Sequence, residues 1–141
     1  MYDLEIEPDL ARFTFTGHET ITLEVFKPID RIVLHAVDIK IQKAFLTDTG
    51  KSQFAHAPKK ISYDAKFETA IFLFSEKIKP GHYSLKLEFT GELNDKMHGF
   101  YRTSYSVDGS QRWGAATQFE ATDARRCFPC FDEPDLKARF R

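Results

Sequence analysis

The residues most able to do chemistry in this chain lie close together, between Trp113 and Pro134. Gln118 and Glu120 are two positions apart, so on an extended strand their side chains would share one face, opposite Phe119. An amide and a carboxylate on one face could hold a cationic or amine-bearing group, although a solvated strand end would show the same spacing. A segment this rich in charged and turn residues is typical of loops that carry function.

Two adjacent arginines, Arg125 and Arg126, follow this pair. A guanidinium group binds carboxylate or phosphate through parallel hydrogen bonds, so an anionic ligand is one interpretation. Acidic residues nearby favour a second interpretation, an internal ion-pair network that holds an irregular loop in place. These neighbours are Asp123, Asp132, Glu133 and Asp135. Glu120 could also pair locally with either arginine, because charged loop residues often do.

Cys127 and Cys130 form a C-x-x-C pair, a spacing found in redox sites and in zinc sites. A redox pair would open a helix after a strand, and a structural zinc ion would need two further ligands at matching spacing. The sequence offers neither, so we expect two buried, reduced thiols. The five histidines are scattered and form no His-Glu-x-x-His pattern, so we expect no metal ligand set within the chain.

Length and composition indicate one globular domain that spans residues 1–141. Twenty basic and 21 acidic side chains give a net charge of −1, which offers no electrostatic footprint for nucleic acid or an anionic membrane surface. No apolar run approaches the ~20 residues needed to cross a bilayer. The N-terminal residues do not resemble a signal peptide, so we expect a cytoplasmic protein.

Apolar and polar residues alternate with period two along most of the remaining sequence, which predicts strands. The clearest patterns are residues 82–90 and residues 13–25. The latter could be one long strand or two joined at a bulge near Gly17, and its apolar face is interrupted by Gly17 and Glu19. The run 71–74 is apolar throughout, so we expect it to be buried on both faces. Weaker patterns predict strands at 2–7, 31–36, 39–47, 60–63 and 111–119.

Closely spaced turn signals separate these strands, so we predict an all-β fold, a twisted antiparallel β-sandwich. We expect no helix longer than about two turns, and a helical turn near residues 132–136. Residues 137–141 begin another alternating pattern and then stop. We therefore expect the domain to be truncated at its C-terminal end.

Residues 117–126, Thr-Gln-Phe-Glu-Ala-Thr-Asp-Ala-Arg-Arg, followed by Phe-Pro-Cys-Phe-Asp-Glu-Pro at 128–134, resemble a family signature. It is the signature of the N-terminal domain in zinc aminopeptidases of the aminopeptidase N family, which includes the puromycin-sensitive enzymes and the tricorn-interacting factors. Residues 99–105 resemble that family's Gly-Phe-Tyr-Arg-Ser-x-Tyr segment. The likeness covers nearly the whole chain, although Cys127 stands where the family usually has a small residue such as Ala.

The resemblance implies a saddle-like β-sandwich that packs on a separate catalytic zinc domain. The zinc ligands would lie outside residues 1–141, so this fragment alone should bind no zinc and be inactive. In the family, the Glu that matches Glu120 grips the free α-amine of a peptide substrate. The Gln that matches Gln118 lies in the pocket for the first side chain. The implied function is substrate anchoring in a zinc metallo-aminopeptidase that releases N-terminal amino acids from peptides.

One alternative of a different class stays open, a stand-alone β-sandwich interaction module with no peptidase activity. Separation from a catalytic partner would leave an apolar surface exposed near residues 97–120, where Met97, Phe100 and Tyr101 cluster. Exposed apolar patches promote association. We therefore expect the fragment to self-associate.

Overall fold

The computed structural model describes residues 1–50 and 55–141, and its regular structure is almost entirely β. The strands are β1 (Tyr2–Asp9), β2 (Thr14–Val25), β3 (Ile29–His35), β4 (Ile39–Asp48), β5 (Ala55–His56), β6 (Lys60–Asp64), β7 (Thr69–Ile78), β8 (Gly81–Glu92), β9 (Gly99–Val107) and β10 (Ser110–Gln118). In the described residues, the one helical element is the 3₁₀ turn η1 (Ala124–Arg126). No helix in these residues is long and apolar enough to cross a membrane. The predicted all-β fold is confirmed.

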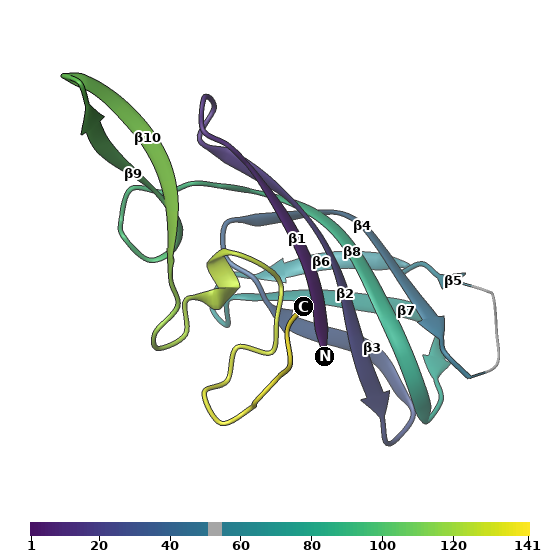
Figure 1. Cartoon of the computed structure of the whole chain (residues 1–141). Helices are drawn as coiled ribbons and strands as arrows, with labels where there is room; N and C mark the ends of the chain where they lie inside the picture. Colours follow the sequence, from purple (N-terminus) through teal and green to yellow (C-terminus); the bar gives the residue numbers. More distant parts are fainter. Residues whose placement is uncertain (51–54) are drawn as a thin grey trace.

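The larger sheet has the strand order β1-β2-β8-β4-β5, with antiparallel pairing throughout (Figure 1). β2 pairs with β8 without a register shift, from Thr14 opposite Glu92 to Val25 opposite Gly81. Residues 14–25 are therefore one long strand, without a bulge at Gly17. Gly17 is needed there because a Cβ atom would lie 2.2 Å from the Phe89 ring.

The smaller sheet has the order β3-β7-β6 and contributes to the same core as the larger sheet (Figure 1). Leu34 and Phe72 from the smaller sheet and Leu85 from the larger are completely buried. The expectation that residues 71–74 are buried on both faces is wrong. Phe72 and Phe74 face the core, whereas Ile71 and Leu73 point to the other face, where they stay partly exposed.

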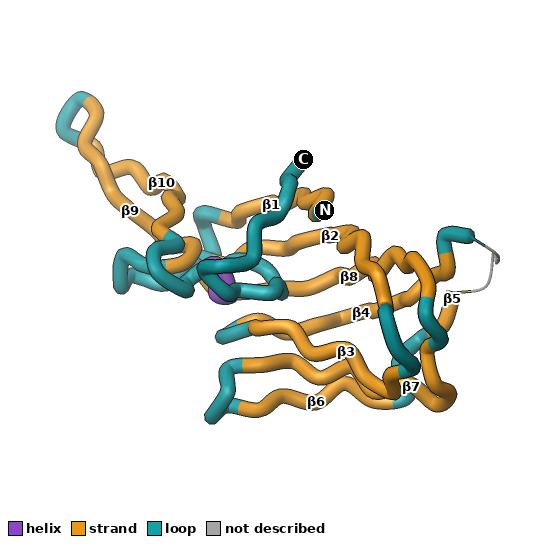
Figure 2. Tube along the Cα trace, turned by 90° about the horizontal axis from the view of Figure 1, so that it is seen from below, coloured by secondary structure: helices purple, strands orange, loops and turns teal. Residues whose placement is uncertain are grey.

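Strands β9 and β10 form a hairpin of their own, which projects away from both sheets (Figures 1 and 2). It contacts the turn between β1 and β2 through aromatic side chains. The Phe13 ring lies 4.9 Å from the Trp113 ring, edge to face, and the Arg102 guanidinium group lies 4.7 Å from the centre of the Phe13 ring. These contacts fix the direction of β10, and Gln118 is the last residue of that strand.

Residues 119–141, here called the C-terminal segment, return from the hairpin and pack against the sheets (Figure 1). Phe140 pairs with Tyr2 in a parallel bridge, supported by hydrogen bonds from the backbone N–H groups of Tyr2 and Leu4 to the carbonyl oxygens of Arg139 and Arg141. The Tyr2 and Phe140 rings stack 5.1 Å apart, and both pack edge-on against Phe128. Residues 139–141 therefore extend the larger sheet beyond β1.

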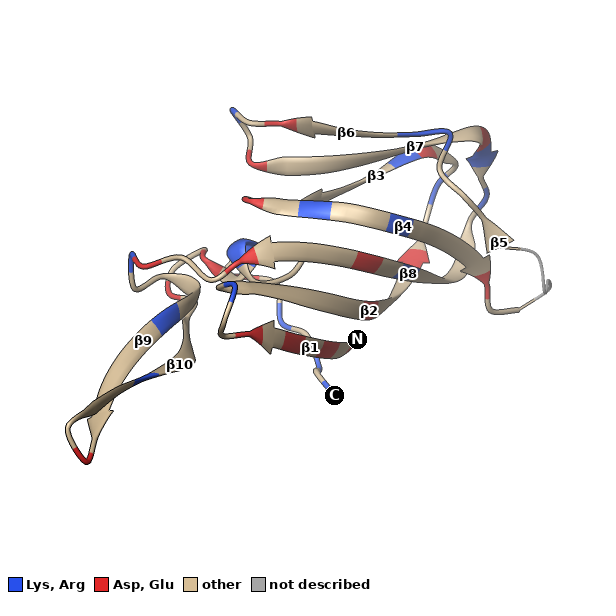
Figure 3. Ribbon diagram, turned by 90° about the horizontal axis from the view of Figure 1, so that it is seen from above, with Lys and Arg blue, Asp and Glu red and all other residues tan. Residues whose placement is uncertain are grey.

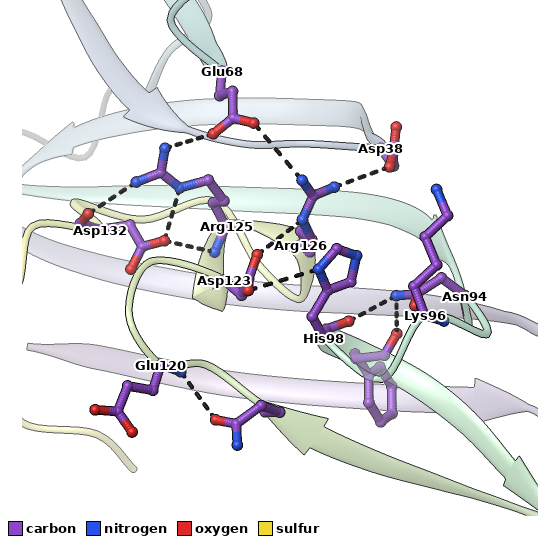
Figure 4. A network of polar contacts seen from close by, with 12 residues as sticks. Asp38, Glu68, Asn94, Lys96, His98, Glu120, Asp123, Arg125, Arg126 and Asp132 are labelled. Carbon is purple, nitrogen blue, oxygen red and sulfur yellow. Dashed lines mark hydrogen bonds and ion pairs between the residues drawn. The ribbon is translucent and has the colours of Figure 1, made fainter.

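The helical turn of this segment is not where the sequence predicted it. It spans Ala124–Arg126, whereas residues 132–136 contain only a turn closed by the hydrogen bond from Leu136 N–H to the Glu133 carbonyl. Pro134 lies inside the predicted stretch and has no N–H to donate, which limits helix formation there. The tight turn at 124–126 instead places both arginine side chains over the sheets (Figure 4).

Arg125 is buried and joins the C-terminal segment to the smaller sheet (Figure 4). Its Nε lies 2.9 Å from Asp132 Oδ2, and its Nη1 lies 2.8 Å from Oε2 of Glu68, which directly precedes β7. Its Nη2 donates to the Asp132 carbonyl at 3.0 Å. Three nitrogens of one guanidinium group are thus satisfied by fixed acceptors, as a buried charge requires.

Arg126 makes a second set of pairs beside the first. Its Nε lies 3.0 Å from Asp123 Oδ1, and its two Nη atoms approach Asp38 at 3.3 Å and Glu68 at 3.7 Å. Asp38 directly precedes β4, so this residue connects the segment to the larger sheet as well.

The predicted internal network is therefore confirmed for Asp123 and Asp132. Glu133 lies instead near His35, with 3.6 Å between Oε1 and Nε2. Apart from this network, β1 carries acidic residues without basic ones, whereas β4 carries both (Figure 3).

Replacing Arg125 with alanine should lower the free energy of unfolding by about 3 kcal/mol, because the Asp132 carboxylate, which is only 11% exposed, would lose its partner. Chemical denaturation followed by circular dichroism measures this change. Arg31→Ala is the matched control, because Arg31 forms an exposed pair with Asp30 at 2.9 Å, and it should leave the midpoint nearly unchanged. Equal effects of the two substitutions would contradict the anchoring role of Arg125.

Candidate functional site

Gln118 and Glu120 lie at the point where the hairpin meets the C-terminal segment, and both are exposed. Figure 4 shows Glu120 in the turn below Arg125 and Arg126. Strand β10 ends at Gln118, one residue earlier than the predicted strand, so Glu120 lies in the turn that follows. A hydrogen bond holds the two residues together: the Glu120 backbone N–H donates to Gln118 Oε1 at 3.0 Å. Gln118 therefore fixes the main chain of Glu120, a role that the spacing alone did not suggest.

Phe119, between them, points the other way. Its ring is partly buried and lies 6.0 Å from the Phe128 ring, edge to face. The expected inward anchor is present, and it leaves the amide and the carboxylate outside.

The Glu120 carboxylate forms no ion pair within residues 1–50 and 55–141. The nearby guanidinium groups of Arg125 and Arg126 are already bound by other carboxylates. The alternative in which Glu120 pairs with one of these arginines is therefore wrong for this structure. An exposed carboxylate with a fixed backbone is suited to binding a cation.

Asp123 closes the turn that carries Glu120. Its backbone N–H donates to the Phe119 carbonyl at 3.0 Å, and its carboxylate lies between Arg126, at 3.0 Å, and His98, at 3.8 Å (Figure 4). Sequence reasoning proposed Asp123 as an arginine partner but missed His98, which approaches from the loop before β9.

The base of the hairpin touches the same arginine. Gly99 has φ +67°, and a Cβ atom on it would lie 2.4 Å from Arg126 Cβ. Gly99 is the cross-strand partner of Gln118. Arg126 thus contacts both the strand pair that carries Gln118 and the turn that carries Glu120, and this close approach requires glycine.

Cys127 and Cys130 are buried and free, as expected. Burial raises the pKa of the Cys127 thiol to about 12 and that of the Cys130 thiol further still, so both stay protonated at neutral pH. Within the described part of the chain, no three His, Cys, Asp or Glu side chains are arranged to hold a metal ion. The described residues therefore offer no ligand set for a zinc ion.

The exposed apolar surface differs in one residue from the cluster that the sequence predicted. Met97 is exposed and Tyr101 is half-buried, but Phe100 is buried, with its ring 5.2 Å from the Phe15 ring. The expectation for Phe100 is wrong because β9 directs it into the core. The exposed apolar side chains lie further along the hairpin, at Tyr105, Val107 and Trp113.

Comparison with known proteins gives a consistent result. A family model described as the Peptidase M1 N-terminal domain matches residues 1–141. Aminopeptidase 2 of Candida albicans is 45% identical over 140 residues, which is 99% of this chain and 14% of the relative. Aminopeptidase M1 of Arabidopsis thaliana is 44% identical over 142 residues, again 99% of this chain, and 16% of its own length.

Puromycin-sensitive aminopeptidase of Caenorhabditis elegans is 39% identical over 141 residues, covering 99% of this chain and 15% of the relative. The chain thus spans between 14% and 16% of the length of these relatives. With the family model matched from end to end, this chain belongs to the Peptidase M1 N-terminal domain family.

Proposed function

We propose that this domain anchors the free α-amine of a peptide in a zinc-dependent aminopeptidase, and that the Glu120 carboxylate makes the contact. The observation that carries the proposal is the state of Glu120, whose carboxylate is exposed and free of ion pairs among the described residues, while its backbone is held by Gln118. The relatives named above are aminopeptidases, which supports the same reaction class.

A protonated amine against a carboxylate forms a charge-assisted hydrogen bond, which is roughly twice as strong as a neutral one. Such a contact requires a free chain terminus, so it selects the first residue of a peptide over an internal one. The Gln118 Oε1 atom is occupied by Glu120, and the amide nitrogen stays available to line the pocket for the first side chain.

The peptide-bond chemistry is proposed to belong to a catalytic zinc domain of the same protein. The zinc ion would supply Lewis-acid chemistry there, and this domain would supply only binding and orientation. The exposed hairpin residues Tyr105, Val107 and Trp113 are proposed to contact that partner domain. A cytoplasmic location also stays a prediction from the sequence.

In the full-length protein, Glu120→Gln should reduce kcat/KM for peptides with a free N-terminus by roughly ten- to a hundredfold, because a charge-assisted contact is lost. Steady-state kinetics on aminoacyl reporters measures the loss. Glu76→Gln, an exposed glutamate on β7, is the matched control and should leave kcat/KM unchanged.

Peptides with an acetylated N-terminus provide a second control for this prediction. Their slow residual turnover should be the same in the wild type and in Glu120→Gln, because no ammonium group is present to lose. Full activity of Glu120→Gln on free-amine substrates would show that the carboxylate has another role.

Gln118→Met keeps the size of the side chain but removes the acceptor for the Glu120 N–H. We expect kcat/KM to fall roughly two- to tenfold, the range of one neutral hydrogen bond, whereas Gln118→Glu retains an acceptor oxygen and should lose less. If Gln118 acts by positioning Glu120, the penalty of Gln118→Met should largely vanish in the Glu120→Gln background. Full additivity of the two substitutions would contradict positioning.

The 141-residue chain should form dimers or larger species as its concentration rises, since its hairpin exposes a cluster of apolar side chains. Sedimentation equilibrium measures this tendency. Replacing Tyr105 and Val107 with serine should weaken it, while Phe26→Ser, in the exposed turn between β2 and β3, should not. A strict monomer at about millimolar concentration would contradict the prediction.

A further inference from the structure

Glu19 is a carboxylic acid on the core side of β2. The residues that share its face, Phe15, Gly17 and Ile21, are buried, and Glu19 itself is only 3% exposed. Its cross-strand neighbours are Leu4 on β1 and Leu87 on β8. No ligand can reach this carboxyl group from solvent without movement of the structure.

Neither oxygen of Glu19 has a hydrogen-bond partner in the described residues. The titratable groups that face it are the Tyr2 phenol on β1 and the thiols of Cys127 and Cys130 in the C-terminal segment. All three are neutral groups at neutral pH, and their own pKa values are raised in part by the Glu19 charge. No described cation forms an ion pair with Glu19, so nothing among these residues offsets a charge at this position.

An ionised carboxylate without a partner is unfavourable in a protein interior. Burial accordingly raises the pKa of Glu19 well above its ordinary value of 4.5. The closed structure therefore favours the neutral acid.

Residues 127–130 belong to the same buried cluster as Phe15 and Ile21, which flank Glu19 on the core side of β2. These residues pack on the core through Cys127, Phe128 and Cys130, and they pair with His35 through the bridge at Cys130. The same stretch follows Arg125 and Arg126 directly. Separation of residues 127–130 from the core would therefore also disturb the stretch of chain that carries these arginines.

We propose that Glu19 is a proton-dependent latch: while it carries a proton, residues 127–130 stay packed in the core cluster that they share with β2, and loss of that proton promotes their separation from it. The latch is independent of the proposed function, because it concerns only contacts within residues 1–141.

The direction of the pH dependence follows from the two states. In the open state Glu19 meets water and has its ordinary pKa, so the open state binds fewer protons than the closed state. Above about pH 4.5 the opening equilibrium should therefore rise as pH rises, by up to about tenfold per pH unit. The rise ends when the pH passes the raised pKa of the closed state, since both states are then ionised.

Reaction of the thiols with an aromatic disulfide reagent reports opening, because Cys127 and Cys130 are buried in the closed structure. Labelling rates of the 141-residue chain would be measured from about pH 5 to about pH 9, beside Glu19→Gln at each pH. The ratio of the two rates cancels the ionisation of the thiols themselves in the open state. We expect this ratio to climb with pH by up to about tenfold per unit and then level off.

Glu19→Leu provides a second comparison that removes the polar group entirely. It should give the same pH-dependent ratio as Glu19→Gln, so the test survives if either variant folds poorly. A ratio that does not change with pH would overturn the latch. Labelling no faster than global unfolding, measured by denaturant titration at the same pH, would also overturn it, because the opening would then not be local.

Discussion

The placement of the candidate site depends on two adjacent guanidinium groups. Arg125 and Arg126 connect the C-terminal segment to the residues that precede β4 and β7, Asp38 and Glu68. Both of these acidic residues have positive φ, 56° and 55°, and each ends a turn directly before its strand. Asp38 and Glu68 thus adopt a left-handed backbone conformation, which is unfavourable for residues other than glycine. In this conformation their carboxylates reach the arginines.

This network of ion pairs contributes more to positioning the turn that carries Glu120 than to the stability of the fold. Desolvation of a buried ion pair can cancel most of its Coulomb attraction, and well-packed apolar residues often stabilise a core equally well. A guanidinium group, however, donates hydrogen bonds only in its own plane and at fixed angles. Arg126 holds Asp123, the residue that closes the turn from Phe119, while its other nitrogens are held by Asp38 and Glu68. Glu120 lies within this turn, so the contacts that hold the turn also position Glu120.

Sequence patterns predicted the strands that bury one face, because burial produces an alternation of apolar and polar residues. They failed where a strand is not buried and shows no such alternation. β2 and β8 were evident because inward and outward residues alternate along their full length. β9 was missed, because the hairpin is exposed on both sides beyond Arg102 and its residues follow no apolar alternation. Glu19 appeared as an interruption in the apolar face of β2, but only the folded structure shows that its carboxyl group is buried without a hydrogen-bond partner among the described residues.

The residues of the candidate site also fall into those that the sequence predicted and those that it did not. Spacing and family resemblance pointed to Gln118 and Glu120, and the two are adjacent in space. Asp38, Glu68 and His98 could not be predicted as their supports, because they are brought to residues 120–126 by tertiary folding rather than by local sequence. The bond between Gln118 and the Glu120 backbone was also hidden, since it depends on where β10 ends.

The parallel bridge between Tyr2 and Phe140 has a consequence for synthesis of the chain. β1 leaves the ribosome well before residues 139–141, which cover its outer edge. Until they emerge, the nascent sheet displays an unpaired edge, the kind of surface on which other strands can add. The acidic side chains of Asp3, Glu5 and Glu7 along β1 place like charges on that edge, which discourages two nascent chains from pairing there.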